Sequence, residues 1–106
     1  MRHTKGLLVI VLALACTAVS AAQGSPEAGR KKISMCLGCH GIPDYKTTFP
    51  SVYSVPKLGG QHPEYIVKAL QEYKTGERSH PSMKGVVETL SDQDMADIAA
   101  YFGGLK

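Results

Sequence analysis

The sequence predicts a small all-α domain of three to four helices. Two apolar stripes with helical spacing lie at residues 65–73 and 95–102, whereas residues 41–60 hold prolines and glycines too closely spaced for a regular element. Apolar and polar residues do not alternate with a period of two over any useful length, so essentially no sheet is expected.

The first expected helix covers residues 27–39, with Glu27 near its start. The second begins at Pro63, whose missing N–H would be unpaired in a first turn, and ends before Gly76, which suits the left-handed position after a helix. Its apolar face comprises Tyr65, Ile66, Ala69, Leu70 and Tyr73.

A second loop, residues 76–85, contains Pro81 and Met83 and leads to the last helix. There Ser91 is followed three residues later by Asp94, which resembles a capping box with Asp in place of Glu. The stripe of this helix comprises Met95, Ile98, Ala99 and Phe102 and runs up to Gly103.

Residues 1–22 have the pattern of a signal peptide. Arg2 and Lys5 give a positive start, residues 7–15 are apolar but too few to span a bilayer, and small residues precede a cleavage site after Ala22. Export to the periplasm is therefore expected, with residues 23–106 forming one domain. Cys16 also stands in a partial lipoprotein box, so a lipid anchor at Cys16 is the alternative to plain cleavage.

The composition of the predicted domain narrows its function. Trp is absent and the chain has only 2 Phe, so a large apolar cofactor would help to complete the core of so small a domain. Without the two basic residues of the signal, ten Lys and Arg face nine Asp and Glu. Such a near-neutral balance argues against a nucleic-acid binder, which needs a clustered basic surface.

The sequence from Cys36 through Cys39 to His40 is the Cys-x-x-Cys-His pattern of covalent haem attachment. Two thiols three residues apart on a helix project to one side and can each add to a vinyl group of one haem, and the next residue, His40, then lies under the iron. Three other interpretations are less consistent with the sequence. A thioredoxin-like dithiol would need a strand and helix pattern that is missing, and a structural zinc site would need a second pair of ligands. A disulfide would leave the adjacent histidine unexplained.

Four stretches make the chain resemble the bacterial class I cytochromes c, and most closely one half of the periplasmic di-haem cytochromes. They are Ala28-Gly29, residues 36–41, residues 56–61, and Met83 followed by residues 90–101. The resemblance implies the small class I fold around one haem c, with Gly29 at a close helix crossing. It also implies that the Pro56 carbonyl accepts a hydrogen bond from His40 and that Met83 is the sixth iron ligand.

The sixth ligand can also be weighed from the residues themselves. Met35 lies on the helix that carries His40, and Met95 belongs to an apolar stripe, whereas Met83 lies in a loop free to reach the opposite face of the ring. His80, in the same loop, is the rival, with a solvated loop position as its plainer interpretation. Two departures from the family stand out: this sequence has a single attachment motif, and its loop 41–55 looks longer than usual.

With His40 and Met83 on the iron, no site remains open for a substrate, which predicts an electron carrier and not an enzyme. The alternatives are a haem enzyme or gas sensor with an open sixth position, and the electron-entry subunit of a larger oxidoreductase. The expected partners are redox proteins that donate and accept the electron.

Overall fold

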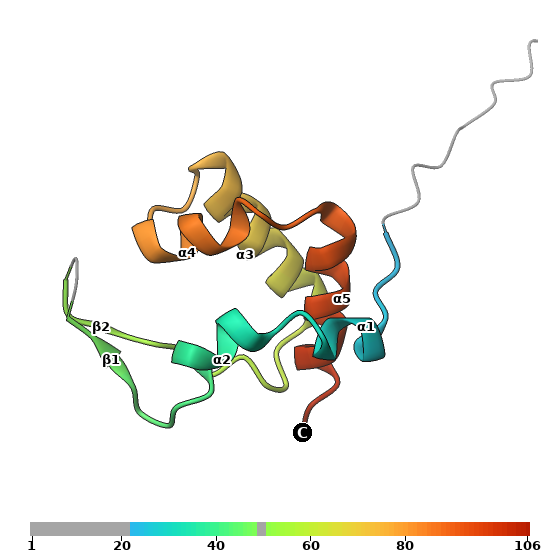
Figure 1. The fold of residues 1–106 in the computed structure, drawn as a ribbon, viewed down its shortest axis with the longest axis horizontal. Coiled ribbons are helices and arrows are strands. Elements are labelled where there is room, and N and C mark those ends of the chain that lie inside the picture. The colour runs from blue at the N-terminus through green and yellow to red at the C-terminus, as the bar shows by residue number, and fades with distance from the viewer. Residues whose placement is uncertain (1–21, 49–50) are drawn as a thin grey trace, which may run out of the picture.

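The computed structural model describes residues 22–48 and 51–106, which fold as short helices and one small hairpin (Figure 1). Residues 1–21 of the predicted signal peptide, Cys16 among them, lie outside these residues. In chain order the described elements are α1 (Pro26–Arg30), α2 (Ser34–His40), β1 (Lys46–Thr47), β2 (Tyr53–Ser54), α3 (Pro63–Thr75), α4 (Pro81–Val87) and α5 (Asp92–Gly103).

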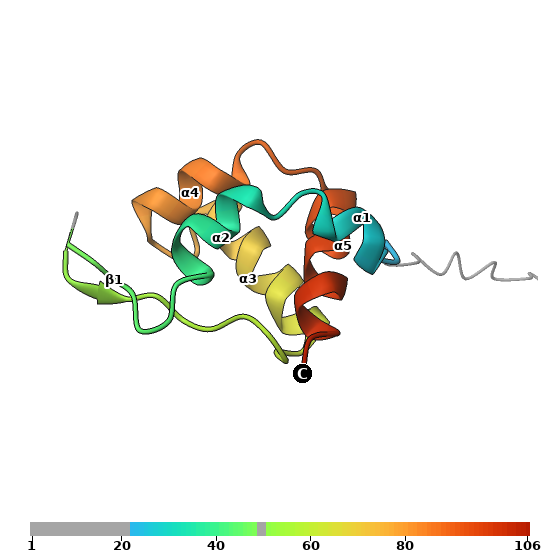
Figure 2. The same ribbon diagram turned by 60° about the horizontal axis from the view of Figure 1, so that its bottom comes forward.

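The core lies where α1 and α3 pack against α5, as both ribbon views show (Figures 1 and 2). The predicted stripe of α5 is confirmed, because Met95 and Ala99 are fully buried and Ile98 and Phe102 almost so. On α3, Ile66 and Leu70 are buried in the same cluster. None of the helices in the described ranges is long and apolar enough to cross a membrane.

The helix ends of α3 and α5 follow the predicted local signals. Pro63 opens α3, and Gly76 ends it in the left-handed conformation with φ 88°. At α5 both hydrogen bonds of the capping box form: the Asp94 N–H donates to Ser91 Oγ at 3.1 Å, and the Ser91 N–H donates to Asp94 Oδ2 at 3.0 Å. These two helices were predictable because their boundaries depend on residues next to them in the sequence.

The single helix expected at residues 27–39 is wrong, because the chain leaves the helical path between α1 and α2. In this break Ile33 is buried in the core, and Lys32 Nζ lies 2.7 Å from Asp97 Oδ2 and 2.7 Å from Asp94 Oδ1 on α5. The buried Asp97 carboxylate also accepts the Ser25 N–H at 2.9 Å. Tertiary contacts with α5 therefore outweigh local helix propensity.

Two further expectations need correction. A sheet does form: β1 and β2 pair antiparallel, with Lys46 opposite Ser54 and Thr47 opposite Tyr53, and their hairpin projects from the helical body (Figures 1 and 2). Residues 81–85 of the predicted second loop belong to α4 (Pro81–Val87), which has Pro81 in its first turn and a side-chain cap from His80. A pairing of two residues per strand is too short to give a periodic signal.

Candidate functional site

One cavity lies between α2, α3, α4 and the hairpin. The empty space in and in front of it is about 1320 Å³, open solvent included. All five residues of the predicted apolar face of α3 line it. The other lining residues include Cys36, Cys39, His40, Tyr53, Val55, Pro56, Leu58, Arg78, His80, Met83, Val86, Leu90 and Ile98. The wall is therefore mainly aliphatic and aromatic, with a few polar groups set into it.

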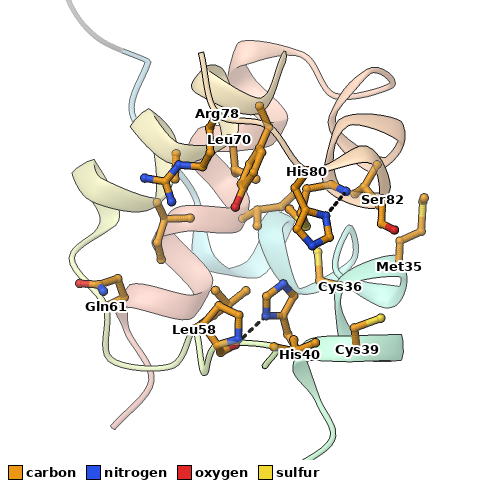
Figure 3. Close-up of a pocket in the computed structure, with 18 of the residues that line it drawn as sticks. Met35, Cys36, Cys39, His40, Leu58, Gln61, Leu70, Arg78, His80 and Ser82 are labelled. Carbon is orange, nitrogen blue, oxygen red and sulfur yellow. Dashed lines mark hydrogen bonds between the residues drawn. The ribbon is translucent and has the colours of Figure 1, made fainter. Parts of the chain in front are cut away.

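Helix α2 brings the attachment motif to this cavity. Cys36 and Cys39 are spaced as neighbours on one helix face, and Figure 3 shows them with His40 on the same side of the pocket. Both thiols are free within the described part of the chain. Burial raises the pKa of the Cys36 thiol, so that this sulfur is protonated at neutral pH.

The His40 ring is held in one orientation by the backbone of the following loop. Its Nδ1 lies 2.7 Å from the carbonyl oxygen of Pro56 (Figure 3). Because a carbonyl oxygen only accepts hydrogen bonds, Nδ1 carries the hydrogen and donates it. The lone pair of Nε2 is then available to a metal.

Met83 reaches the cavity from α4. The sequence had placed Met83 in a loop, and that expectation is wrong. Its side chain is partly buried and packs against the hydrophobic core. The Met83 N–H donates to Nδ1 of His80 at 3.4 Å, which makes His80 the N-cap of α4. The thioether sulfur and the His40 imidazole thus belong to different elements that line one cavity.

His80 is not a freely solvated loop residue. Its ring meets the rings of Tyr53 and Tyr73 edge to face, with centroids 5.2 Å and 6.3 Å apart. It also lines the cavity, together with Met83. His80 thus lies in the loop before α4, as the sequence predicted, but its ring is partly buried against two aromatic side chains from other elements.

Sequence reasoning missed Arg78, which places a positive charge on the cavity wall. Its guanidinium lies over the rings of Tyr65 and Tyr73, at 5.8 Å and 5.4 Å from their centroids, and its Nε donates to Glu72 Oε2 at 3.3 Å. The Tyr65 hydroxyl, with Tyr73 next, raises the pKa of Arg78 further above its usual range. A signal was present, since Tyr65 and Tyr73 lie on one face of the helix that precedes Arg78.

The comparison with known families agrees with this geometry, since residues 26–106 match the family described as cytochrome c. The chain belongs to the cytochrome c family. It is 40% identical over 102 residues to cytochrome c4 of Pseudomonas aeruginosa, covering 96% of this chain and 49% of that protein. It is 38% identical over 82 residues to cytochrome c-554(548) of Halomonas halodenitrificans, covering 74% of this chain and 94% of that protein.

A solved structure gives the same result for the fold. The crystal structure of reduced recombinant cytochrome c4 from Pseudomonas stutzeri superposes with a TM-score of 0.57 at 26% identity, covering 82% of this chain and 53% of that one. The chain spans about half the length of the cytochrome c4 relatives, which confirms the resemblance to one half of a longer cytochrome. The class I fold expected from the sequence is thereby confirmed.

Membership in the cytochrome c family implies a covalently bound haem c. The residues of this cavity fit such a group: its largely apolar wall suits a flat apolar ring, two thiols lie beside it, and the His40 ring presents a free nitrogen lone pair. Thioether and imidazole are also donors that haem iron takes in cytochromes.

Proposed function

We propose that this chain is a periplasmic electron carrier whose single haem c is bonded to Cys36 and Cys39, with His40 and Met83 as the axial ligands of its iron. The observation that carries the proposal is the convergence of a thiol pair, an oriented imidazole and a thioether on one apolar cavity. Bound haem supplies one-electron chemistry, since its iron cycles between the ferrous and ferric states.

The roles of the protein's own residues follow from their contacts. The Pro56 carbonyl fixes the ring of His40 and makes its Nε2 a better donor, because the hydrogen bond at Nδ1 adds electron density to the imidazole. The soft sulfur of Met83 favours the ferrous state, and so does the apolar wall, because it disfavours the extra charge of the ferric state. Both effects raise the reduction potential.

The choice of Met83 over His80 is supported by the hydrogen bond between them. When Nδ1 of His80 accepts the Met83 N–H, the hydrogen of the neutral ring lies on Nε2, and neither nitrogen has a free lone pair. His80 would have to abandon this contact to bind iron. Met83 keeps its sulfur free while its backbone is bonded.

The test compares two methionine variants of the haem-loaded protein. Met83→Ala should convert the low-spin iron to high spin, lower the reduction potential and let the ferrous protein bind carbon monoxide quickly. Met95→Ala is the matched control, because Met95 is fully buried in the core and does not line the cavity, so its iron should stay low-spin. Unchanged spectra and potential in Met83→Ala would refute the ligand set.

The periplasmic location and the carrier role need separate measurements. Fractionation of cells expressing the whole chain should place the haem protein in the periplasm, cleaved after Ala22; retention in the membrane fraction with an acylated Cys16 would favour the lipid anchor. Size-exclusion chromatography of the periplasmic extract should elute the protein alone. Stable co-elution with one oxidoreductase would favour the electron-entry subunit instead.

A further inference from the structure

His80 lies at a junction of three elements, namely β2 of the hairpin, α3 and α4. It is the residue before α4, its ring contacts Tyr53 of β2, and it contacts Tyr73 near the end of α3. Its ring nitrogen Nδ1 accepts the backbone N–H of Met83, the third residue of α4. Figure 3 shows the ring of His80 directed into the pocket with this hydrogen bond at its side.

Helix α4 depends strongly on such a cap. It has only seven residues, PSMKGVV, which include a glycine and two valines with poor helix propensity. A helix this short is not stable by propensity alone, so its first turn needs a side-chain acceptor and tertiary packing. The Met83 N–H is one of the unpaired donors of that first turn, and His80 Nδ1 pairs it.

We infer that His80 is a positioning residue for Met83: it fixes the start of α4 and thereby keeps the Met83 thioether directed into the haem cavity. This inference rests on the proposed ligand role of Met83. The contacts of the His80 ring with Tyr53 and Tyr73 help to hold the cap in place, so that the hairpin and α3 both restrict the movement of α4. His80 acts through Met83 and does not touch the iron.

Two substitutions at His80 separate its capping function from the contacts of its ring. Asn is among the best N-cap residues and can accept the same N–H, but it lacks an imidazole that could bind iron or pack between tyrosines. Ala lacks an acceptor altogether. His80→Ala therefore removes the cap, His80→Asn restores it, and both remove any ligation by His80 itself.

The experiment measures carbon monoxide binding to the ferrous haem protein and the sulfur-to-iron charge-transfer band of the ferric protein. Because Met83 must leave the iron before carbon monoxide binds, loss of the cap in His80→Ala should speed binding about five-fold, the factor that a typical lost N-cap gives. The charge-transfer band should weaken in parallel. His80→Asn should bring both readouts most of the way back to the wild-type values, because it keeps the cap and loses only the ring contacts.

Ser91→Ala is the matched control, because it removes the N-cap of α5, whose Oγ accepts the Asp94 N–H at 3.1 Å. Ser91 does not line the haem cavity. This variant should unfold at a lower temperature with unchanged carbon monoxide binding, which distinguishes a local effect on Met83 from a general loss of stability. Equal acceleration in Ser91→Ala and His80→Ala would overturn the inference.

The remaining outcomes separate this inference from the proposed function. If His80→Ala and His80→Asn both behave like wild type while Met83→Ala opens the iron, His80 does not position Met83 although Met83 is the ligand. If both His80 variants speed binding equally, the ring contacts and not the cap hold Met83, and the inference fails. If both lose the low-spin state and Met83→Ala keeps it, His80 is the sixth ligand and the proposed ligand set fails.

Discussion

Gly29→Ala should be among the most damaging small substitutions in this protein. A Cβ atom at Gly29 would lie 2.0 Å from the Asp97 carbonyl oxygen and 2.9 Å from the Cβ of Tyr101 on α5, far inside ordinary contact distance. The close crossing that the family resemblance implied at Gly29 is thus confirmed. The atom in the way belongs to the backbone of α5, which cannot turn aside as a side chain can.

Relief of this clash requires α1 to move away from α5 by about an ångström or more, since Cβ atoms in proteins essentially never come closer than 3.0 Å to such an atom. That movement would also stretch the 2.9 Å bond from the Ser25 N–H to the Asp97 carboxylate. Overpacking costs about 1–3 kcal/mol and a lost hydrogen bond to a charged group about 1.5–3 kcal/mol. The expected loss is roughly 3–5 kcal/mol, out of about 5–15 kcal/mol for a whole domain.

The assay is denaturant unfolding of the haem-loaded protein, followed by circular dichroism, with thermal unfolding alongside. A loss of that size should lower the midpoint temperature of thermal unfolding by roughly 12 °C or more. Gly85→Ala on α4 is the matched control, because its new Cβ would meet nothing within 4 Å and its φ is not positive. That variant should gain about 0.5–1 kcal/mol. A Gly29→Ala protein within about 0.5 kcal/mol of wild type would refute the packing argument.

The structure also predicts the effects of three other perturbations. Met95→Ala, at a fully buried site, should cost about 2–5 kcal/mol in denaturant unfolding. Lys32 holds the pKa of Asp94 and of Asp97 at about 2, below the ordinary 3.8. The stability that these two carboxylates contribute should therefore be full above pH 3.8 and be lost as the pH falls through about 2. In Asp97→Asn, unfolding measured at several pH values should show a smaller loss of stability in acid. Acid-acetone extraction should leave haem on the wild-type chain and release it from a Cys36→Ala, Cys39→Ala double variant; release from wild type would contradict the covalent link.

The parts of the fold that the sequence predicted are those with short-range causes. Pro63 and Gly76 bound α3, and the reciprocal pair of Ser91 and Asp94 starts α5, so each boundary is set by residues within one turn of it. The attachment motif is local for a chemical reason, because two thioethers on one ring require closely spaced cysteines. The spacing of apolar residues, the helix caps and the chemistry of haem attachment were therefore sufficient to predict these elements.

The elements that were missed depend on distant partners. The break between α1 and α2 accompanies the pairing of Lys32 with Asp97, 65 residues further along the chain. Helix α4 begins at a histidine cap, which is not among the usual N-cap residues, and contains Gly85 in its interior. Local propensity gives the wrong answer for both segments, since tertiary contacts supply the missing stability.

The two sides of the candidate haem site also differ in whether neighbouring or distant residues determine them. On one side, Cys36, Cys39 and His40 lie within one helix, and the Pro56 carbonyl is added from outside it. On the other side, Met83 lies in a helix that propensity does not favour and that begins at His80, whose ring in turn contacts tyrosines of two further elements. Sequence reasoning can therefore name the atoms that would bind iron on both sides. What holds Met83, the proposed second ligand, in place emerges only when the hairpin, α3 and α4 are assembled. If Met83 binds the iron, we therefore expect variation at that junction to alter the stability of the sulfur–iron bond without altering the ligands.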